Sequence, residues 1–110
     1  MKFSNIIFEK KEGVAKITLN RPDVLNALDT QTLQEMGAAV ENIENDSSVR
    51  VVVITANGRA FCTGADLTGI ASLPPDKPRD YFLRLWNKVF SAIEDLSIPV
   101  IAAINGMALA

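Results

Sequence analysis

Alternating apolar positions predict two strands near the amino terminus. The turn-forming segment "KKEG" at residues 10–13 separates them, with Gly13 at its end. The alternating positions are Ile6 and Phe8 in the first strand, and Ala15, Ile17 and Leu19 in the second. A period of two places such side chains on one face of a strand. We therefore expect a hairpin over residues 3–19 with one solvated face.

Two longer segments have apolar residues at helical spacing. The first predicted helix spans residues 30–45, and Asp29 suits its amino terminus because a carboxylate can accept hydrogen bonds from the free amides of the first turn. The second spans residues 79–96. The apolar stripes comprise Leu33, Met36, Val40 and Ile43 in the first helix, and Phe82, Leu85, Trp86, Val89, Phe90, Ile93 and Leu96 in the second.

Two continuous apolar runs predict buried strands. These are "VRVVVITA" at residues 49–56 and "PVIAAING" at residues 99–106. Such runs are typical of strands covered on both faces. The order strand, strand, helix, strand, helix, strand implies right-handed crossovers and a sheet with helices packed on it. The predicted fold class is α/β.

The segments between these elements favour loops. "NRPDVLNAL" at residues 20–28 should cross a sheet edge, because Pro22 cannot continue a strand ladder and Asn20 and Asn26 favour turns. A short helix is expected near residues 66–72. The proline-rich "SLPPDKPRD" after it should be an exposed loop.

Length and composition limit the function classes. A chain of 110 residues, 48% of them hydrophobic, can form one domain or part of one. Its formal charge of −2 argues against a nucleic-acid partner. No apolar run reaches the ~18 residues of a membrane span. The single cysteine, Cys62, cannot close an internal disulfide, and the first residues lack a secretory signal, which together predict a reducing, cytoplasmic setting.

The chain contains no histidine. This excludes the commonest general base, every histidine-based triad and the usual zinc ligand sets, so no metal is predicted. Cys62 has neither a histidine nor an adjacent lysine to favour its thiolate, and we interpret it as a small buried hydrophobe.

The glycine-rich turn "GRAFCTGADL" at residues 58–67 is the candidate site. Gly58 and Gly64 permit unusual backbone angles, and Ala65 adds almost no bulk. At the start of the helix expected there, the amides of Ala65 and Asp66 could stabilise negative charge as an oxyanion hole. Alternatively, the small residues only let the turn pack beneath a helix. Asp66 is expected to cap backbone amides rather than to abstract protons.

Other polar and aromatic side chains have simpler interpretations. Glu94 and Asp95 are expected to be solvated on the second helix, and Arg59 to be a solvated loop residue rather than a phosphate contact. Trp86 and Phe90 are four residues apart in the apolar stripe and should pack in the core. The turn matches neither the dinucleotide-binding nor the P-loop glycine pattern.

Three blocks together resemble the crotonase superfamily, that of enoyl-CoA hydratases and isomerases. They are "VAKITLNRPDVLNAL", "VRVVVITANGRAFCTGADL" and "IPVIAAINGMALA", in that order and at matching separations. The resemblance implies a spiral of β-β-α units that is incomplete in this chain, with residues 1–110 forming the amino-terminal part of a single domain.

The same resemblance implies an acyl-CoA thioester as substrate, with coenzyme A as part of it and no separate cofactor. Two backbone N–H donors would stabilise the thioester enolate. The first falls on Ala65, and the second on the residue following Ala110. Residues implied to line the substrate are Val24, Leu25, Ala27, Thr63, Gly64, Ala65, Asp66 and Leu67. A homo-oligomer, trimer or hexamer, is also implied.

The sequence departs from the family pattern in ways that leave two functions open. The two glutamates of family hydratases fall beyond residue 110, and Asp23 stands where many relatives have a lysine near the CoA. The first function is an enzyme that hydrates or isomerises an enoyl-CoA, with this chain alone inactive. The alternative is a non-catalytic module for acyl-CoA binding or subunit interaction.

Overall fold

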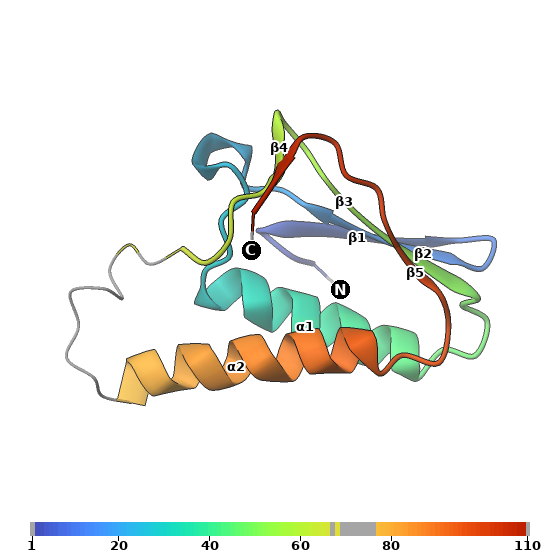
Figure 1. Cartoon of the computed structure of the whole chain (residues 1–110). Helices are drawn as coiled ribbons and strands as arrows, with labels where there is room; N and C mark the ends of the chain where they lie inside the picture. The colour runs from blue at the N-terminus through green and yellow to red at the C-terminus, as the bar shows by residue number, and fades with distance from the viewer. Residues whose placement is uncertain (1, 67, 69–76, 110) are drawn as a thin grey trace.

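The computed structural model describes residues 2–66, 68 and 77–109, in which a strand-strand-helix order occurs twice before a last pair of strands (Figure 1). The elements are β1 (Ile6–Lys11), β2 (Val14–Leu19), α1 (Thr30–Glu44), β3 (Val51–Ala56), β4 (Ala60–Cys62), α2 (Lys77–Glu94), β5 (Val100–Ala102) and β6 (Met107–Ala108). A 3-10 turn, Pro22–Val24, lies within the predicted loop of residues 20–28. The α/β class and the repeated unit agree with the prediction.

Four strands form one mixed sheet in the order β1-β2-β3-β5. The β1–β2 hairpin is antiparallel, and β3 pairs in parallel with both β2 and β5. Helices α1 and α2 lie on the same side of this sheet (Figure 1). The parallel pairs place the carboxyl ends of β2 and β3 at the same edge, because Leu19 is opposite Ala56. Both candidate segments, residues 20–28 and 57–66, leave the sheet at that edge.

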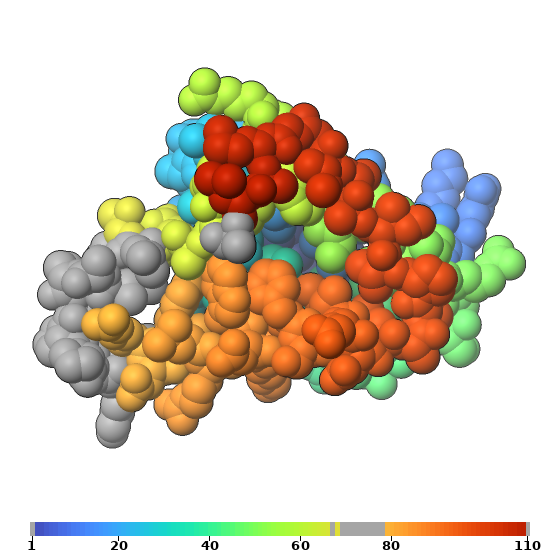
Figure 2. All heavy atoms as spheres, viewed as in Figure 1, coloured from blue at the N-terminus to red at the C-terminus, as the bar shows by residue number. Residues whose placement is uncertain are grey.

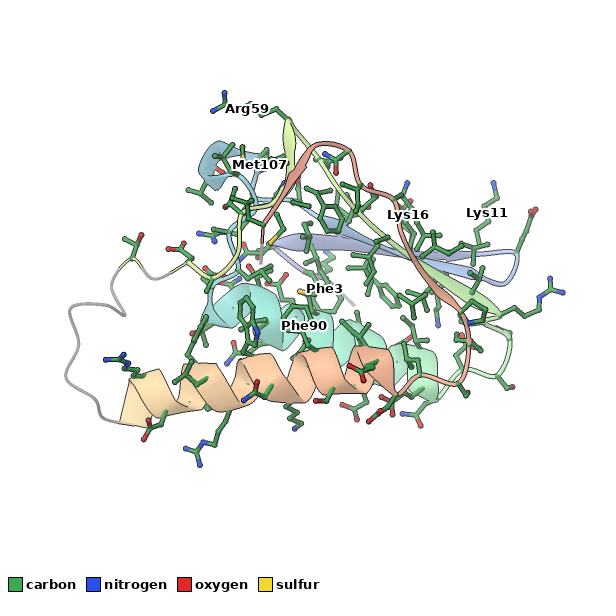
Figure 3. The ribbon with its side chains drawn as sticks, in the orientation of Figure 1. Phe3, Lys11, Lys16, Arg59, Phe90 and Met107 are labelled. Carbon is green, nitrogen blue, oxygen red and sulfur yellow. The ribbon has the colours of Figure 1, made fainter. Side chains whose placement is uncertain are left out.

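The predicted hairpin and first helix are confirmed. Ile6, Ala15, Ile17 and Leu19 are buried. Lys11 and Lys16 point to the face of the sheet away from the helices (Figure 3). The Asp29 carboxylate accepts a 2.8 Å hydrogen bond from the Thr32 amide at the start of α1. The apolar stripe of α1 packs on the sheet and on α2. In α2, Phe82 and Val89 are buried.

The expected double burial of the two apolar strands is wrong. In β3, Val52 is buried facing the helices, but Val51 and Val53 on the other face are only half-buried. β5 pairs only with β3 among the described strands and ends at Ala102, four residues before the predicted end. Ile101 and Ile104 are 52% and 60% exposed. The continuous apolar sequences of β3 and β5 are therefore not covered on both faces of the sheet by the described residues.

The strands β4 and β6 were not predicted. They form a separate two-stranded parallel sheet with an irregularity between Ala60 and Cys62. Strands of three and two residues are too short to produce a recognisable alternation. Leu109 extends the pairing, since its amide donates to the Cys62 carbonyl at 2.8 Å. This small sheet holds residues 105–109 beside the glycine-rich turn.

A close backbone approach at Gly106 makes the β4–β6 contact possible. A Cβ atom there would collide with the Arg59 carbonyl oxygen. We expect Gly106→Ala to lower the free energy of unfolding by about 2 kcal/mol, the usual cost of overpacking. In the matched control Gly37→Ala, the new methyl would lie 3.4 Å from Val89. That control should be neutral or stabilising, because alanine favours helix by up to ~1 kcal/mol. Equal urea midpoints for the two variants would contradict the expectation.

None of the helices in the described ranges is long and apolar enough to cross a membrane. Residues 67 and 69–76, which include most of the predicted short helix and proline-rich loop, lie outside the described residues. Residues 77 and 78, expected in the loop, belong to α2.

Candidate functional site

A parallel backbone bridge joins the loop after β2 to the turn after β4. The Leu28 amide donates to the Gly64 carbonyl and the Asp66 amide donates to the Leu28 carbonyl, both at 2.9 Å. The Thr63 hydroxyl also donates to the Leu25 carbonyl at 3.3 Å. The structure thus brings the loop around Leu25 and Leu28 next to residues 63–66, and the family resemblance implied that these two segments share a site.

The bridge directs the Ala65 amide away from Leu28. Along an extended chain, N–H and C=O groups of successive residues alternate sides, so the groups of Ala65 face opposite to those of Gly64 and Asp66 that bond Leu28. Among the described residues, the Ala65 N–H donates no hydrogen bond. Gly64 has φ +106°, a conformation that side chains rarely adopt. The backbone angle of Gly64 therefore sets the direction of the Ala65 N–H.

The Arg21 side chain contacts residues on both sides of the Leu28–Ala65 bridge. The Arg21 guanidinium donates to the Ala27 carbonyl, lies 3.2 Å from Asp66 Oδ2 through Nη1, and lies 3.5 Å from Asp29 Oδ2 through Nη2. Arg21 comes from the end of β2, Asp29 caps α1, and Asp66 follows the glycine-rich turn. One side chain therefore ties three segments to each other.

The Asp66 carboxylate is a hydrogen-bond acceptor rather than a base. It accepts the Thr68 amide at 3.0 Å, as expected of a capping side chain. Burial alone would raise its pKa, but the hydrogen bonds from Thr68 and Arg21 lower the pKa below its usual value. Asp66 is consequently ionised at neutral pH, so the residue that directly follows Ala65 carries a negative charge.

The buried side-chain amide of Asn26 connects the loop after β2 to the residues on either side of the turn between β3 and β4. Asn26 is 1% exposed, its Oδ1 accepts the Arg21 amide at 2.8 Å, and its Nδ2 donates to the carbonyls of Asn57 and Ala60. Its φ of +57° suits asparagine better than most residues. The sequence suggested Asn26 only as a turn former, so this bridging role was missed.

An apolar cavity of about 440 Å³ opens beside the turn. Figure 2 shows a hollow between the carboxy-terminal segment in red and α2 in orange. Its lining includes Leu19, Leu28 and Ile54 from the sheet side, Trp86, Phe90 and Ile93 from α2, and Phe61, Cys62, Gly64, Ala108 and Leu109 around the turn. Phe90 points from α2 toward the sheet (Figure 3). Gly64 lines this cavity and directly precedes Ala65, so the candidate donor lies one residue from the cavity lining.

The other described residues singled out from the sequence lie either at the cavity or on the surface. Cys62 is a buried free thiol whose pKa is raised by burial, in agreement with its interpretation as a small hydrophobe. Trp86 and Phe90 pack with ring centroids 5.0 Å apart, on the cavity wall.

Glu94, Asp95 and Arg59 are exposed as predicted, and Arg59 points away from the turn (Figure 3). Val24 is 39% exposed, while Leu67 lies outside the described residues. In the described part of the chain, no group of three acidic or cysteine side chains could hold a metal ion.

Comparison with known proteins identifies the family. The sequence model described as "Enoyl-CoA hydratase/isomerase" matches residues 9–110. The chain belongs to this family. The crotonase resemblance inferred from the three blocks is thereby confirmed.

Individual members of the enoyl-CoA hydratase/isomerase family resemble the chain along almost its whole length. The chain is 44% identical to a short-chain-enoyl-CoA hydratase of Clostridium acetobutylicum and 42% identical to a crotonyl-CoA hydratase of Syntrophomonas wolfei. Each alignment covers 99% of this chain and 42% of the relative. The crystal structure of an enoyl-CoA hydratase from Bacillus anthracis superposes with TM-score 0.87 at 36% identity, covering 96% of this chain and 41% of that one. The chain therefore spans about two fifths of the length of these relatives.

The Arg21–Asp66 ion pair was the main feature of the candidate site that sequence reasoning missed. The two residues are 45 positions apart and come from different blocks. Their opposite charges next to a glycine-rich turn and an expected loop were the available signal. Nothing in the spacing of either block indicated that the two segments would meet through the Leu28–Ala65 bridge.

Proposed function

We propose that this chain binds the thioester end of an acyl-CoA at the Leu28–Ala65 junction, with the Ala65 N–H as one donor of an oxyanion hole. The reaction of a full-length enzyme with this site is then the hydration or isomerisation of an enoyl-CoA. The observation that carries this proposal is the backbone N–H of Ala65, which faces away from Leu28 and directly follows Gly64 in the lining of an apolar cavity. Preorganised amides in such sites stabilise developing negative charge without having to reorient.

The path of the carboxy-terminal segment supports a second donor nearby. β6 runs parallel to β4, and Leu109 is already paired with Cys62. A chain that continued in this register beyond residue 110 would carry its next amides past Gly64 and Ala65. The family resemblance assigns the second donor to that place, and the substrate-lining residues to Val24, Leu25, Ala27 and Thr63 through Leu67.

Ala65 can be tested directly by NMR titration of the 110-residue chain with crotonyl-CoA. We expect the Ala65 amide resonance to move together with those of residues 25–28. Free coenzyme A, which lacks the thioester carbonyl, is the control and should leave Ala65 nearly unmoved. The same chain should not hydrate crotonyl-CoA, because one donor alone is half of the hole and removal of a donor costs about 3 kcal/mol of barrier. Binding without a shift at Ala65 would contradict the proposal, whereas clear hydration would contradict only the expectation that the 110-residue chain is inactive.

The alternative function, a non-catalytic interaction module, is favoured by a different observation. Ile101, Ile104, Met107 and Leu109 are all more than half exposed on the β5–β6 segment. Contiguous exposed apolar surface is typical of interaction sites. The titration separates the two functions, because an interaction module without acyl-CoA binding predicts no shift at Ala65 with either ligand.

A further inference from the structure

The Asp66 carboxylate poses an electrostatic problem for the proposed site. It directly follows the Ala65 donor in sequence, its side chain is only 15% exposed, and it is ionised at neutral pH. A negative charge there opposes negative charge on any ligand oxygen that accepts from the Ala65 N–H. In a partly buried setting this repulsion is screened less than it would be in water.

Arg21 lies where it can offset this charge. Its Nη1 is 3.2 Å from Asp66 Oδ2, and its side chain is 20% exposed, so the pair is largely shielded from solvent. The same guanidinium faces Asp29 at 3.5 Å and donates to the Ala27 carbonyl. A planar guanidinium can engage several acceptors at fixed angles, whereas a lysine ammonium acts as a single point charge.

We infer that Arg21 is a positioning residue that neutralises Asp66, so that an anionic thioester oxygen, such as that of an enolate, can bind at the Ala65 N–H. This inference rests on the proposed function and deepens it, because it assigns charge selectivity to a residue outside the predicted substrate contacts. Arg21 acts through Asp66 and through the Ala27 carbonyl rather than by touching the ligand.

Two probe ligands distinguish charge compensation from simple loosening of the fold. Crotonyl-CoA has a neutral thioester, whereas acetoacetyl-CoA can bind as an enolate with negative charge on the thioester oxygen. The affinity of the 110-residue chain for each ligand is measured by calorimetry, and enolate formation by ultraviolet absorbance. Arg21→Gln keeps a donor for Ala27 but removes the positive charge, and Arg21→Lys keeps the charge.

The expected results form a cycle with Asp66→Asn, which removes the negative charge while retaining an acceptor for the Thr68 amide. Arg21→Gln should weaken enolate binding by about tenfold, with little effect on crotonyl-CoA, as expected for loss of one partly shielded charge. Asp66→Asn should strengthen enolate binding, and the double variant should return near the unmodified chain. Arg21→Lys should retain most of the enolate affinity.

Each outcome decides between the claims. The inference would be overturned, and the proposed function left intact, if Arg21→Gln weakened the binding of both ligands equally. The same holds if adding Asp66→Asn to Arg21→Gln did not restore enolate binding. Absence of binding of either ligand to the unmodified chain would overturn both. Arg21→Lys keeps the inference testable if Arg21→Gln does not fold, since its ratio of enolate to crotonyl-CoA affinity should stay close to that of the unmodified chain.

Discussion

Replacing Asn26 by alanine should lower the free energy of unfolding by about 3 kcal/mol. The side chain satisfies the Arg21 amide and the carbonyls of Asn57 and Ala60 from a position that is 1% exposed. Ala60 keeps a second donor, Asn105 Nδ2 at 3.2 Å, so the substitution leaves the other two groups without their partner. A buried group left unsatisfied costs about 1–3 kcal/mol, and these two groups are part-buried. Urea unfolding followed by circular dichroism measures the change.

Two further variants show whether the donors of Asn26 matter. Asn26→Asp retains an acceptor for Arg21 but places a carboxylate against two carbonyl oxygens, so it should destabilise at least as much as alanine. Asn20→Ala is the matched control, because the Asn20 side chain makes an exposed hydrogen bond to Asn57. Exposed substitutions of this kind usually change stability by less than about 0.5 kcal/mol. If Asn26→Ala behaved like Asn20→Ala, the buried bridge would not hold the loop.

Replacing the peptide bond between Gly64 and Ala65 by an ester should weaken crotonyl-CoA binding by about tenfold. The change exchanges one N–H for an oxygen and removes the proposed donor, and a hydrogen bond worth about 1.4 kcal/mol corresponds to that factor. The single cysteine makes the variant accessible, because residues 1–61 and a synthetic peptide of residues 62–110 can be ligated at Cys62. Calorimetric titration compares it with the all-amide chain made by the same ligation.

The ester has one further effect that must be separated from the loss of the donor. An ester carbonyl is a weaker acceptor, and the Gly64 carbonyl accepts the Leu28 amide. The free energy of unfolding of the ester chain reports this contribution. Unchanged affinity for crotonyl-CoA in a folded ester chain would exclude the Ala65 N–H from binding.

Local patterns predicted those elements whose environment lies in their own sequence. The first helix was placed to within a residue because Asp29 caps it by contacting Thr32, only three positions away. The hairpin follows from alternation and from Gly13 at its turn. Burial of β5 could not be obtained in this way, because it depends on which segment lies against each face. Val100–Ala102 has only β3 as a neighbour among the described strands.

The site was predicted in part. Glycine and alanine in the turn indicated a bare amide at Ala65, and the family resemblance assigned the loop residues Val24, Leu25 and Ala27 to the same place. The direction of that amide depends on the left-handed backbone at Gly64 and on a bridge to Leu28, 37 positions earlier in the sequence. Such long-range pairing has no signature in the spacing of either segment. Arg21 and Asn26 were missed as bridging residues for the same reason.

The central claim, that the Ala65 N–H donates to a thioester oxygen, is tested most directly by the carbonyl carbon of the ligand itself. Crotonyl-CoA labelled with ¹³C at the thioester carbonyl is bound to the all-amide chain and to the chain with an ester at position 65. We expect the carbonyl resonance to move downfield on binding to the all-amide chain and to move much less with the ester chain at saturating ligand. Equal shifts in the two complexes would mean that the oxygen is held elsewhere.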